Sequence, residues 1–171
     1  MNYIFLDIVD IDGVLNCKEY IIKHKEKIAS IDESRLKLLS DFCNEYNCLV
    51  VLSSSWRSTL KDDLTPKQDY VKYYDGSIEI SRGKYMCDLF KTYNIPLVGK
   101  TPIYGQHENR AEEILDYINK HFTFPTDKFV IFDDEDDSFS KYFPYNTVLT
   151  DFYGEGLTEK EINEAKLIFE R

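Results

Sequence analysis

Short apolar runs rich in β-branched and aromatic residues recur along the chain, and segments with helical spacing separate them. Each run has the length of a buried strand and predicts one. Strands that alternate with helices are typical of an α/β domain with a mainly parallel sheet, here of five strands. In such sheets the functional site lies at the carboxyl ends of the strands. The runs are residues 3–9, 48–52, 96–98, 128–132 and 147–149.

Between these runs, apolar residues repeat every three or four positions and predict helices. Two of the helices follow a capping box, in which a Ser or Thr is followed three residues later by Glu. The boxes are Ser30 with Glu33 and Thr158 with Glu161, and two further helices are expected over residues 83–93 and 110–121.

Length and charge limit the class of protein. A chain of 171 residues has the size of one ordinary domain, so residues 1–171 are expected to form a single domain. Apolar residues make up 43% of the chain, which is enough for a sizeable core. The formal net charge of −10 disfavours a general binder of DNA or of anionic membrane surfaces, because phosphate groups repel a net anion.

The sequence also indicates a compartment. No apolar run approaches the roughly 20 residues of a membrane-spanning helix. Acidic residues at positions 7, 10 and 12 interrupt the early apolar stretch, which argues against a signal peptide. The four cysteines form no C-x-x-C pair and predict reduced, mostly buried thiols. We therefore expect a cytoplasmic protein with no membrane partner.

Two carboxylates follow the first predicted strand. Asp10 and Asp12 stand two positions apart in D-I-D-G-V-L-N, so they project to the same side of an extended chain. One carboxylate of such a pair can attack phosphorus while the other moves a proton. For two acids alone an acidic strand exit or a helix cap is the plainer interpretation, but the longer string is more specific. Asp7, inside the strand, is expected to form a salt bridge or to face solvent.

The string D-I-D-G-V-L after an N-terminal apolar strand resembles motif I of the haloacid dehalogenase (HAD) superfamily of phosphohydrolases. The resemblance implies a Rossmann-like three-layer HAD core. It implies that Asp10 is the nucleophile that becomes phosphorylated and that Asp12 is the general acid/base. It also implies Mg²⁺ as cofactor, with Asp10 and Asp12 among the residues around the metal.

Three serines follow the second predicted strand, in V-L-S-S-S-W-R. A hydroxyl at a strand end can donate a hydrogen bond to a phosphoryl oxygen. Ser53 matches the Ser or Thr of the family's motif II best, and Ser54 stays an alternative. Ser55 is expected to cap the following helix, and Trp56 to lie in the core. The whole string is similar to a narrower branch, the HAD domain of Swiss Army Knife RNA repair proteins.

The family's motif III is a basic residue, usually a lysine at the start of a helix, and two residues are candidates here. Arg110 opens R-A-E-E-I, which is similar to a string in the RNA-repair branch, and it lies one helix before the fourth strand. Lys100 follows the third strand and ranks second, because a solvated charge is the plainer interpretation. Arg57 is expected either to bind a substrate phosphate through its planar fork or to form a structural salt bridge.

Five consecutive acidic residues, Asp133 to Asp137, follow the fourth predicted strand. Carboxylates this close repel one another unless protons or a cation neutralise them, and hard oxygen ligands suit Mg²⁺. Asp133 and Asp134 are the leading metal ligands, with Asp137 next, at the place of the family's motif IV. Receiver domains carry a similar string in their first strand, but here the chain ends 34 residues after Asp137, which is too few for that topology.

Many HAD enzymes carry a cap domain, inserted after motif I or between motifs II and III. The 14 residues between Asn16 and Ile31 are too few for one. In the second interval only about residues 61–82 are left beside the expected helix and strand. These residues predict a long polar loop or a hairpin with Asp75 and Gly76 at its turn, and hence minimal or no cap and an open site.

Together these features predict a Mg²⁺-dependent phosphomonoester hydrolase that acts through an aspartyl-phosphate. The resemblance to the RNA-repair branch and the small cap favour a phosphorylated RNA or DNA end as substrate. Residues 17–29 carry four Lys and two Glu, and residues 57–84 carry six Lys or Arg and five Asp or Glu, so both segments are mildly positive. A phosphatase of metabolites or nucleotides is the first alternative. A non-catalytic domain that binds phosphate, Mg²⁺ or another protein is the second.

Overall fold

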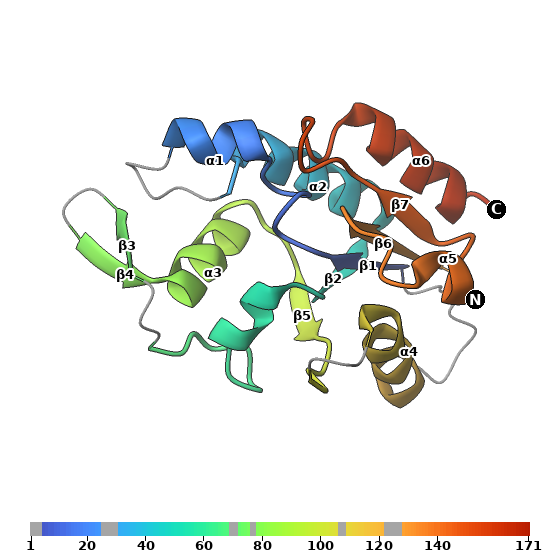
Figure 1. Ribbon diagram of the computed structural model, residues 1–171, viewed down its shortest axis with the longest axis horizontal. Coiled ribbons are helices and arrows are strands. Elements are labelled where there is room, and N and C mark those ends of the chain that lie inside the picture. Colours follow the sequence, from blue (N-terminus) through green and yellow to red (C-terminus); the bar gives the residue numbers. More distant parts are fainter. Residues whose placement is uncertain (1–4, 25–30, 69–71, 76–77, 106–108, 122–127) are drawn as a thin grey trace.

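A computed structural model of the chain describes residues 5–24, 31–68, 72–75, 78–105, 109–121 and 128–171. Its centre is a five-stranded sheet with the strand order β5-β2-β1-β6-β7, and all neighbouring strands run parallel (Figure 1). All five predicted strands are present. They are β1 (Phe5–Val9), β2 (Cys48–Leu52), β5 (Leu97–Lys100), β6 (Phe129–Asp133) and β7 (Thr147–Leu149).

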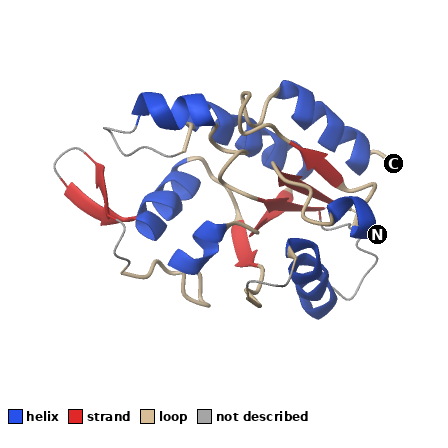
Figure 2. Cartoon of the chain, in the orientation of Figure 1, coloured by secondary structure: helices blue, strands red, loops and turns tan. Residues whose placement is uncertain are grey.

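Helices cover both faces of the sheet and complete three layers (Figures 1 and 2). One face packs against α2 (Glu33–Tyr46), α3 (Arg82–Thr92) and α6 (Glu159–Phe169). The other face packs against α4 (Arg110–His121) and α5 (Phe139–Tyr142). The short helix α1 (Lys18–His24) follows the loop after β1. The expected Rossmann-like three-layer core is confirmed, and no described helix is both long and apolar enough to cross a bilayer.

Both faces of the central strand β1 are buried, as parallel strands between two helical layers require. Leu6 and Ile8 pack in the cluster that contains α4, while Val9 packs in the cluster that contains α2 and α6. Asp7 is fully buried, and the Sγ of Cys43 on α2 donates to its Oδ2 at 3.2 Å. The expectation that Asp7 is salt-bridged or faces solvent is therefore wrong.

One of the two expected capping boxes is present. At the start of α6 the amide of Thr158 donates to the Oε2 of Glu161 at 3.0 Å, and the box is complete. The helix α2 begins later than expected, with Asp32 as its N-cap, and the amide of Ser34 donates to Asp32 Oδ1 at 2.9 Å. An Asp next to the first helical residue is a strong N-cap, so the box predicted at Ser30 is wrong; Ser30 itself lies outside the described residues.

The interval in which a cap could be inserted holds only small elements. A short 3₁₀-helix, η1 (Ser55–Thr59), follows β2. The strands β3 (Lys72–Asp75) and β4 (Ile78–Ser81) pair antiparallel and lead into α3. This is the predicted hairpin, although Gly76 of its predicted turn is outside the described residues. In the part of the chain that the structure describes, no larger unit stands between η1 and α3, in agreement with a minimal cap.

Candidate active site at the carboxyl ends of the strands

Ladder hydrogen bonds continue past the end of β1 and bring neighbouring strand ends together. The amide of Asp10 donates to the carbonyl of Phe132 on β6 at 2.9 Å. The amide of Ser53, after β2, donates to the carbonyl of Val9 at 2.9 Å. Asp10 therefore lies between the carboxyl ends of β2 and β6, where the parallel sheet is expected to place its site.

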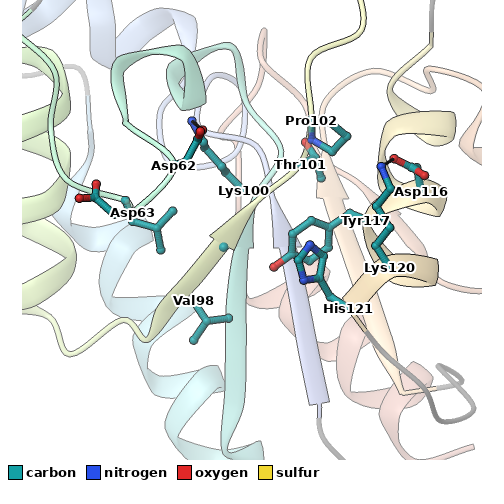
Figure 3. A pocket seen from close by; sticks show the side chains of 12 residues that line it. Asp62, Asp63, Val98, Lys100, Thr101, Pro102, Asp116, Tyr117, Lys120 and His121 are labelled. Carbon is teal, nitrogen blue, oxygen red and sulfur yellow. Dashed lines mark hydrogen bonds and ion pairs between the residues drawn. The ribbon is translucent and has the colours of Figure 1, made fainter.

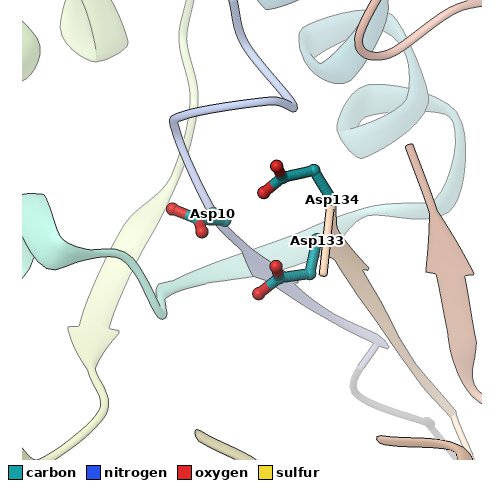
Figure 4. A group of neighbouring side chains, drawn as sticks. All are labelled: Asp10, Asp133 and Asp134. Carbon is teal, nitrogen blue, oxygen red and sulfur yellow. The ribbon is translucent and has the colours of Figure 1, made fainter. Parts of the chain in front are cut away.

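Three carboxylates meet at this edge of the sheet. Asp10, Asp133 and Asp134 each place one carboxylate oxygen within 4.8 Å of the other two (Figure 4). Burial, followed by repulsion from Asp10, raises the pKa of Asp133 to about 7 and the pKa of Asp134 to about 6. A cluster of this kind binds protons unless a cation neutralises it.

Arg110 supplies one positive charge to this cluster. It is the first residue of α4, and its Nη1 donates to a carboxylate oxygen of Asp10 and, at 2.8 Å, to the Oδ2 of Asp133. Burial works to lower the pKa of Arg110, but the attraction of Asp10 and Asp133 raises it above its ordinary value. For Asp10 the effects have the opposite signs: burial raises the pKa of its carboxyl group, and the charge of Arg110 works against that rise. When all three carboxyls are ionised, one guanidinium leaves an excess of negative charge.

Asp137 positions Arg110 and does not join the cluster with its side chain. Its Oδ2 accepts a hydrogen bond from the backbone amide of Arg110 at 2.8 Å, at the amino end of α4. An acid in this position satisfies a free amide at the helix start. Among the described residues, the group of carboxylates that could hold a metal contains Asp10, Asp133 and Asp134.

Asp12 lines the same pocket as Asp10, a cavity of about 350 Å³. Its Oδ2 accepts from the Nε1 of Trp56 at 3.0 Å, and its Oδ1 accepts from the Nδ2 of Asn16 at 2.9 Å. These bonds hold the carboxylate beside the acidic cluster, and its side chain is outside the group that could hold a metal. Trp56 is 2% exposed, so the expectation that it is a core residue is confirmed.

The three serines have three different surroundings. The hydroxyl of Ser54 works to lower the pKa of Asp10, and it accepts from the amide of Trp56 at 3.3 Å. The hydroxyl of Ser53 is buried and accepts from Thr101 Oγ1 at 3.4 Å, on the next strand end. Ser55 is exposed and lines the pocket. The N-cap of η1 is Ser54, so the expectation that Ser55 is the cap is wrong. Ser54 is thus the serine whose side chain reaches Asp10.

Arg57 lies in the protein interior, beneath the serine loop. Its Nη2 donates to the Oε2 of Glu113 on α4 at 2.5 Å, and its Nη1 donates to the carbonyl of Ser54 at 2.9 Å. Both side chains of the ion pair are almost fully buried. Of the two roles considered for Arg57, the geometry matches the structural salt bridge.

Lys100 lines a different pocket, of about 530 Å³, between β5 and α4 (Figure 3). Its Nζ donates to the carbonyl of Leu60 at 2.7 Å and lies 3.6 Å from Asp62. Tyr117 and His121 of α4 line the other side of this pocket. The structure therefore brings Arg110, and not Lys100, to Asp10.

The pocket around Asp10 also contains residues that the sequence did not single out. Phe152 and Tyr153 line it, and Tyr153 is 78% exposed. Glu135, in the acidic run after β6, is exposed and lines the pocket as well. The aromatic pair lies in the loop that follows β7, three and four residues after its last residue. The expectation that functional residues follow the carboxyl ends of parallel strands therefore applies to this pair as well.

A comparison with protein families matches residues 3–162 to the HAD domain in Swiss Army Knife RNA repair proteins. This chain belongs to that family. The match covers the sheet, the pocket and the first residues of α6, and it confirms the resemblance inferred from the motifs. The family places the domain in a superfamily of phosphohydrolases. A comparison with curated protein sequences found no match.

The carboxylates of this HAD domain fit a divalent cation. Hard oxygen ligands are what Mg²⁺ takes from proteins, usually from one or two carboxylates. The side chain of Asp134 can approach because residue 13 is a glycine: a Cβ at this position would lie only 2.3 Å from the Cγ of Asp134. Gly13 also has φ +77°, a conformation that favours glycine. The turn after Asp12 is thus built to let Asp134 approach the motif I loop.

Proposed function

We propose that this HAD domain is a Mg²⁺-dependent phosphomonoester hydrolase that acts through an aspartyl-phosphate. The observation that carries the proposal is the position of Asp10. Its carboxylate lies in a pocket, held by Arg110 and Ser54, next to Asp133 and Asp134. A preorganised carboxylate surrounded by hydrogen-bond donors suits attack on a phosphoryl group.

In the proposed reaction a carboxylate oxygen of Asp10 attacks phosphorus, and the bond between phosphorus and the leaving oxygen breaks. Asp12 gives its proton to that leaving oxygen. Asp12 then takes a proton from a water molecule, whose oxygen attacks phosphorus. The bond between phosphorus and the Asp10 oxygen breaks, which releases inorganic phosphate and restores the Asp10 carboxylate. The hydrogen bonds from Trp56 and Asn16 orient Asp12 for these transfers. Arg110 and the hydroxyl of Ser54 stabilise negative charge on the phosphoryl oxygens.

Asp10, Asp133 and Asp134 would hold Mg²⁺, and Asp12, whose side chain is outside that group, lines the same pocket. When bound, the ion supplies positive charge that neutralises the carboxylates and the transferring phosphoryl group. Asp137 would not contact the ion; it holds the start of α4, and with it the backbone of Arg110, through its hydrogen bond to the Arg110 amide.

As substrate we propose a phosphorylated end of RNA or DNA. The family to which the chain belongs supports this, as does the small hairpin in place of a cap, because an open pocket admits a large substrate. The positive segments 17–29 and 57–84 can guide one or two phosphates despite the net charge of −10. The four cysteines are free thiols, which supports a reducing compartment such as the cytoplasm.

Replacement of the nucleophile tests the proposed activity. We expect Asp10→Asn to lower turnover of a generic aryl phosphate by about 10³-fold or more, because an amide does not form the acyl-phosphate. Asp88→Asn, at an exposed carboxylate on α3, is the matched control and should leave turnover unchanged. Circular dichroism checks that both variants fold. Wild-type turnover in Asp10→Asn would exclude Asp10 as the nucleophile, and a folded wild type without any turnover would favour a non-catalytic domain.

A further inference from the structure

Two aromatic side chains stand beside the pocket that contains Asp10. Phe152 and Tyr153 follow β7, and their rings contact edge to face with centroids 5.4 Å apart. Phe152 is half-buried, whereas 78% of Tyr153 is exposed. An aromatic ring this exposed does not contribute to the core, so its position beside the pocket needs another explanation.

The loop that carries this pair is fixed at both ends to the site. At its start, Thr150 Oγ1 donates to the carbonyl of Gly13 at 2.7 Å, and the Thr150 amide donates to the carbonyl of Asp133 at 2.9 Å. At its end, the amide of Leu157 donates to the carbonyl of Val14 at 2.9 Å. A Cβ on Gly156 would lie 2.7 Å from the carbonyl oxygen of Asn16, so the loop packs closely on the motif I loop. The backbone of the loop that carries Tyr153 is therefore held against the motif I loop that follows Asp10.

A positive charge accompanies the exposed ring. The Nζ of Lys18, at the start of α1, lies 5.0 Å from the centroid of the Tyr153 ring, within the range of a cation–π contact. The amide of Lys18 donates to the carbonyl of Phe152 at 2.8 Å, which ties α1 to the same loop (Figure 1). Lys18 belongs to the positive segment 17–29. The rim thus offers a flat ring and an ammonium group, while the floor of the pocket offers the phosphoryl-transfer residues.

We propose that Tyr153 stacks on the nucleobase of the phosphorylated nucleotide whose phosphate is at Asp10, and that Lys18 binds an adjacent phosphate. This inference rests on the proposed phosphatase activity and adds the part of the substrate that is recognised. Every nucleobase presents a flat π-face, so stacking does not depend on which base is bound. Stacking on an aromatic side chain is strong enough to distinguish a substrate with a base from one without. The shared chemistry is a nucleoside phosphate, either free or at the end of an oligonucleotide.

The test compares three substrates that differ in what they offer to the rim. Ribose 5-phosphate has no base, a 5′-mononucleotide has one base, and oligonucleotides phosphorylated at the 5′ or 3′ end have a base and further phosphates. We expect Tyr153→Ala to lower kcat/KM for the base-bearing substrates by roughly 5- to 150-fold and to leave ribose 5-phosphate within about twofold. Tyr153→Phe should keep wild-type values, because it keeps the ring.

Lys18→Gln should lower kcat/KM for the oligonucleotides more than for the mononucleotide, and the difference should shrink as salt is raised. Tyr145→Ala is the matched control. Tyr145 is 73% exposed, but it precedes β7 and so stands at the opposite edge of the sheet from Tyr153. This variant should leave all substrates unaffected. Higher kcat/KM for the mononucleotide than for the oligonucleotides would identify a free nucleotide as the source of the base, and equal values that Lys18→Gln does not separate would overturn the role of Lys18.

A second measurement detects the contribution of stacking to binding, in a variant that does not turn over substrate. Fluorescence anisotropy of a labelled, phosphorylated oligonucleotide gives its Kd for Asp10→Asn and for the double variant Asp10→Asn/Tyr153→Ala. We expect the Kd to rise by a similar 5- to 150-fold in the double variant. The inference is overturned if Tyr153→Ala lowers kcat/KM for ribose 5-phosphate equally, or if it changes neither turnover nor Kd. Failure of the wild type to hydrolyse any phosphate, the aryl phosphate included, would instead refute the proposed function.

Discussion

Asp7 is an acid in the middle of the central strand, and its surroundings cannot support a charge. Burial raises its pKa to about 7, and hydrogen bonds from the thiols of Cys43 and Cys48 only partly oppose that rise. Within the part of the chain that the structure describes, its Oδ1 has no hydrogen-bond partner. The folded protein therefore keeps Asp7 protonated at a pH at which the unfolded chain has already released the proton.

This difference makes stability depend on pH. A carboxyl whose pKa is higher in the folded state favours folding below its unfolded pKa of 3.8, and that contribution is lost as pH rises towards 7. We expect Asp7→Asn, which never ionises, to gain roughly 4 kcal/mol in unfolding free energy relative to wild type between pH 4 and pH 8. Urea denaturation at both pH values measures the change. Asp41→Asn, at an exposed carboxylate on α2, controls for loss of one negative charge. A pH-independent difference between Asp7→Asn and wild type would show that Asp7 is ionised in the folded protein.

Residue-scale chemistry was predictable where a pattern fixed a position at a strand end. Asp10 and Asp133 are such residues, since each follows or closes a buried run. The serine register was not predictable, because three identical residues carry no pattern, and the turn into η1 decides that Ser54 reaches Asp10. Tyr153 is one of 13 tyrosines, and only the folded loop distinguishes it.

At the scale of elements, the first turn of α4 joins two parts of the site. Arg110 reaches Asp10 and Asp133, and Glu113, one turn later, holds Arg57. Through Arg57 the helix is tied to the carbonyl of Ser54, in the loop that follows β2. The string R-A-E-E-I therefore contacts the acidic cluster through its arginine, and it holds the serine loop through its second glutamate, which pairs with Arg57.

This arrangement predicts the effect of removing Arg57. Arg57→Met removes the guanidinium that neutralises the buried carboxylate of Glu113, so we expect a loss of about 3–5 kcal/mol in unfolding free energy. The double variant Arg57→Met/Glu113→Leu should recover part of this loss. Lys84→Met, in the exposed pair with Asp88 on α3, should cost less than about 1 kcal/mol. Thermal and urea denaturation measure all three. Unchanged stability together with a raised KM would restore Arg57 as a substrate-binding residue.

Elements were more predictable than their ends. The five strands and α4 follow from apolar spacing, and the box at Thr158 fixed the start of α6. The start of α2 was misplaced because Ser30 and Asp32 both have N-cap chemistry, and sequence spacing does not show which one meets the first free amides. Local signals rank such alternatives poorly, since tertiary packing decides between them.

At the scale of the whole molecule, the net charge of −10 and the acidic pocket act in the same direction. Any added salt screens the mutual repulsion of the surface charges and stabilises the fold to some extent. A cation bound by Asp10, Asp133 and Asp134 adds a specific contribution, because it binds the folded site and not the separated residues of the unfolded chain. The two effects are separable by comparing salts at equal ionic strength.

We expect Mg²⁺ at about 100 times its Kd to raise the Tm by roughly 5–10 °C over NaCl of equal ionic strength, which corresponds to about 2.7 kcal/mol of binding linkage. Differential scanning fluorimetry with and without EDTA measures the shift. Asp134→Asn should remove most of it, since the amide lowers the charge of the site. Glu135→Gln, next in the chain but outside the three-carboxylate group, should keep it. If NaCl gives the same shift as MgCl₂, or if Asp134→Asn responds like wild type, the cluster is not the metal site, and phosphatase activity in excess EDTA would show that the reaction needs no divalent ion.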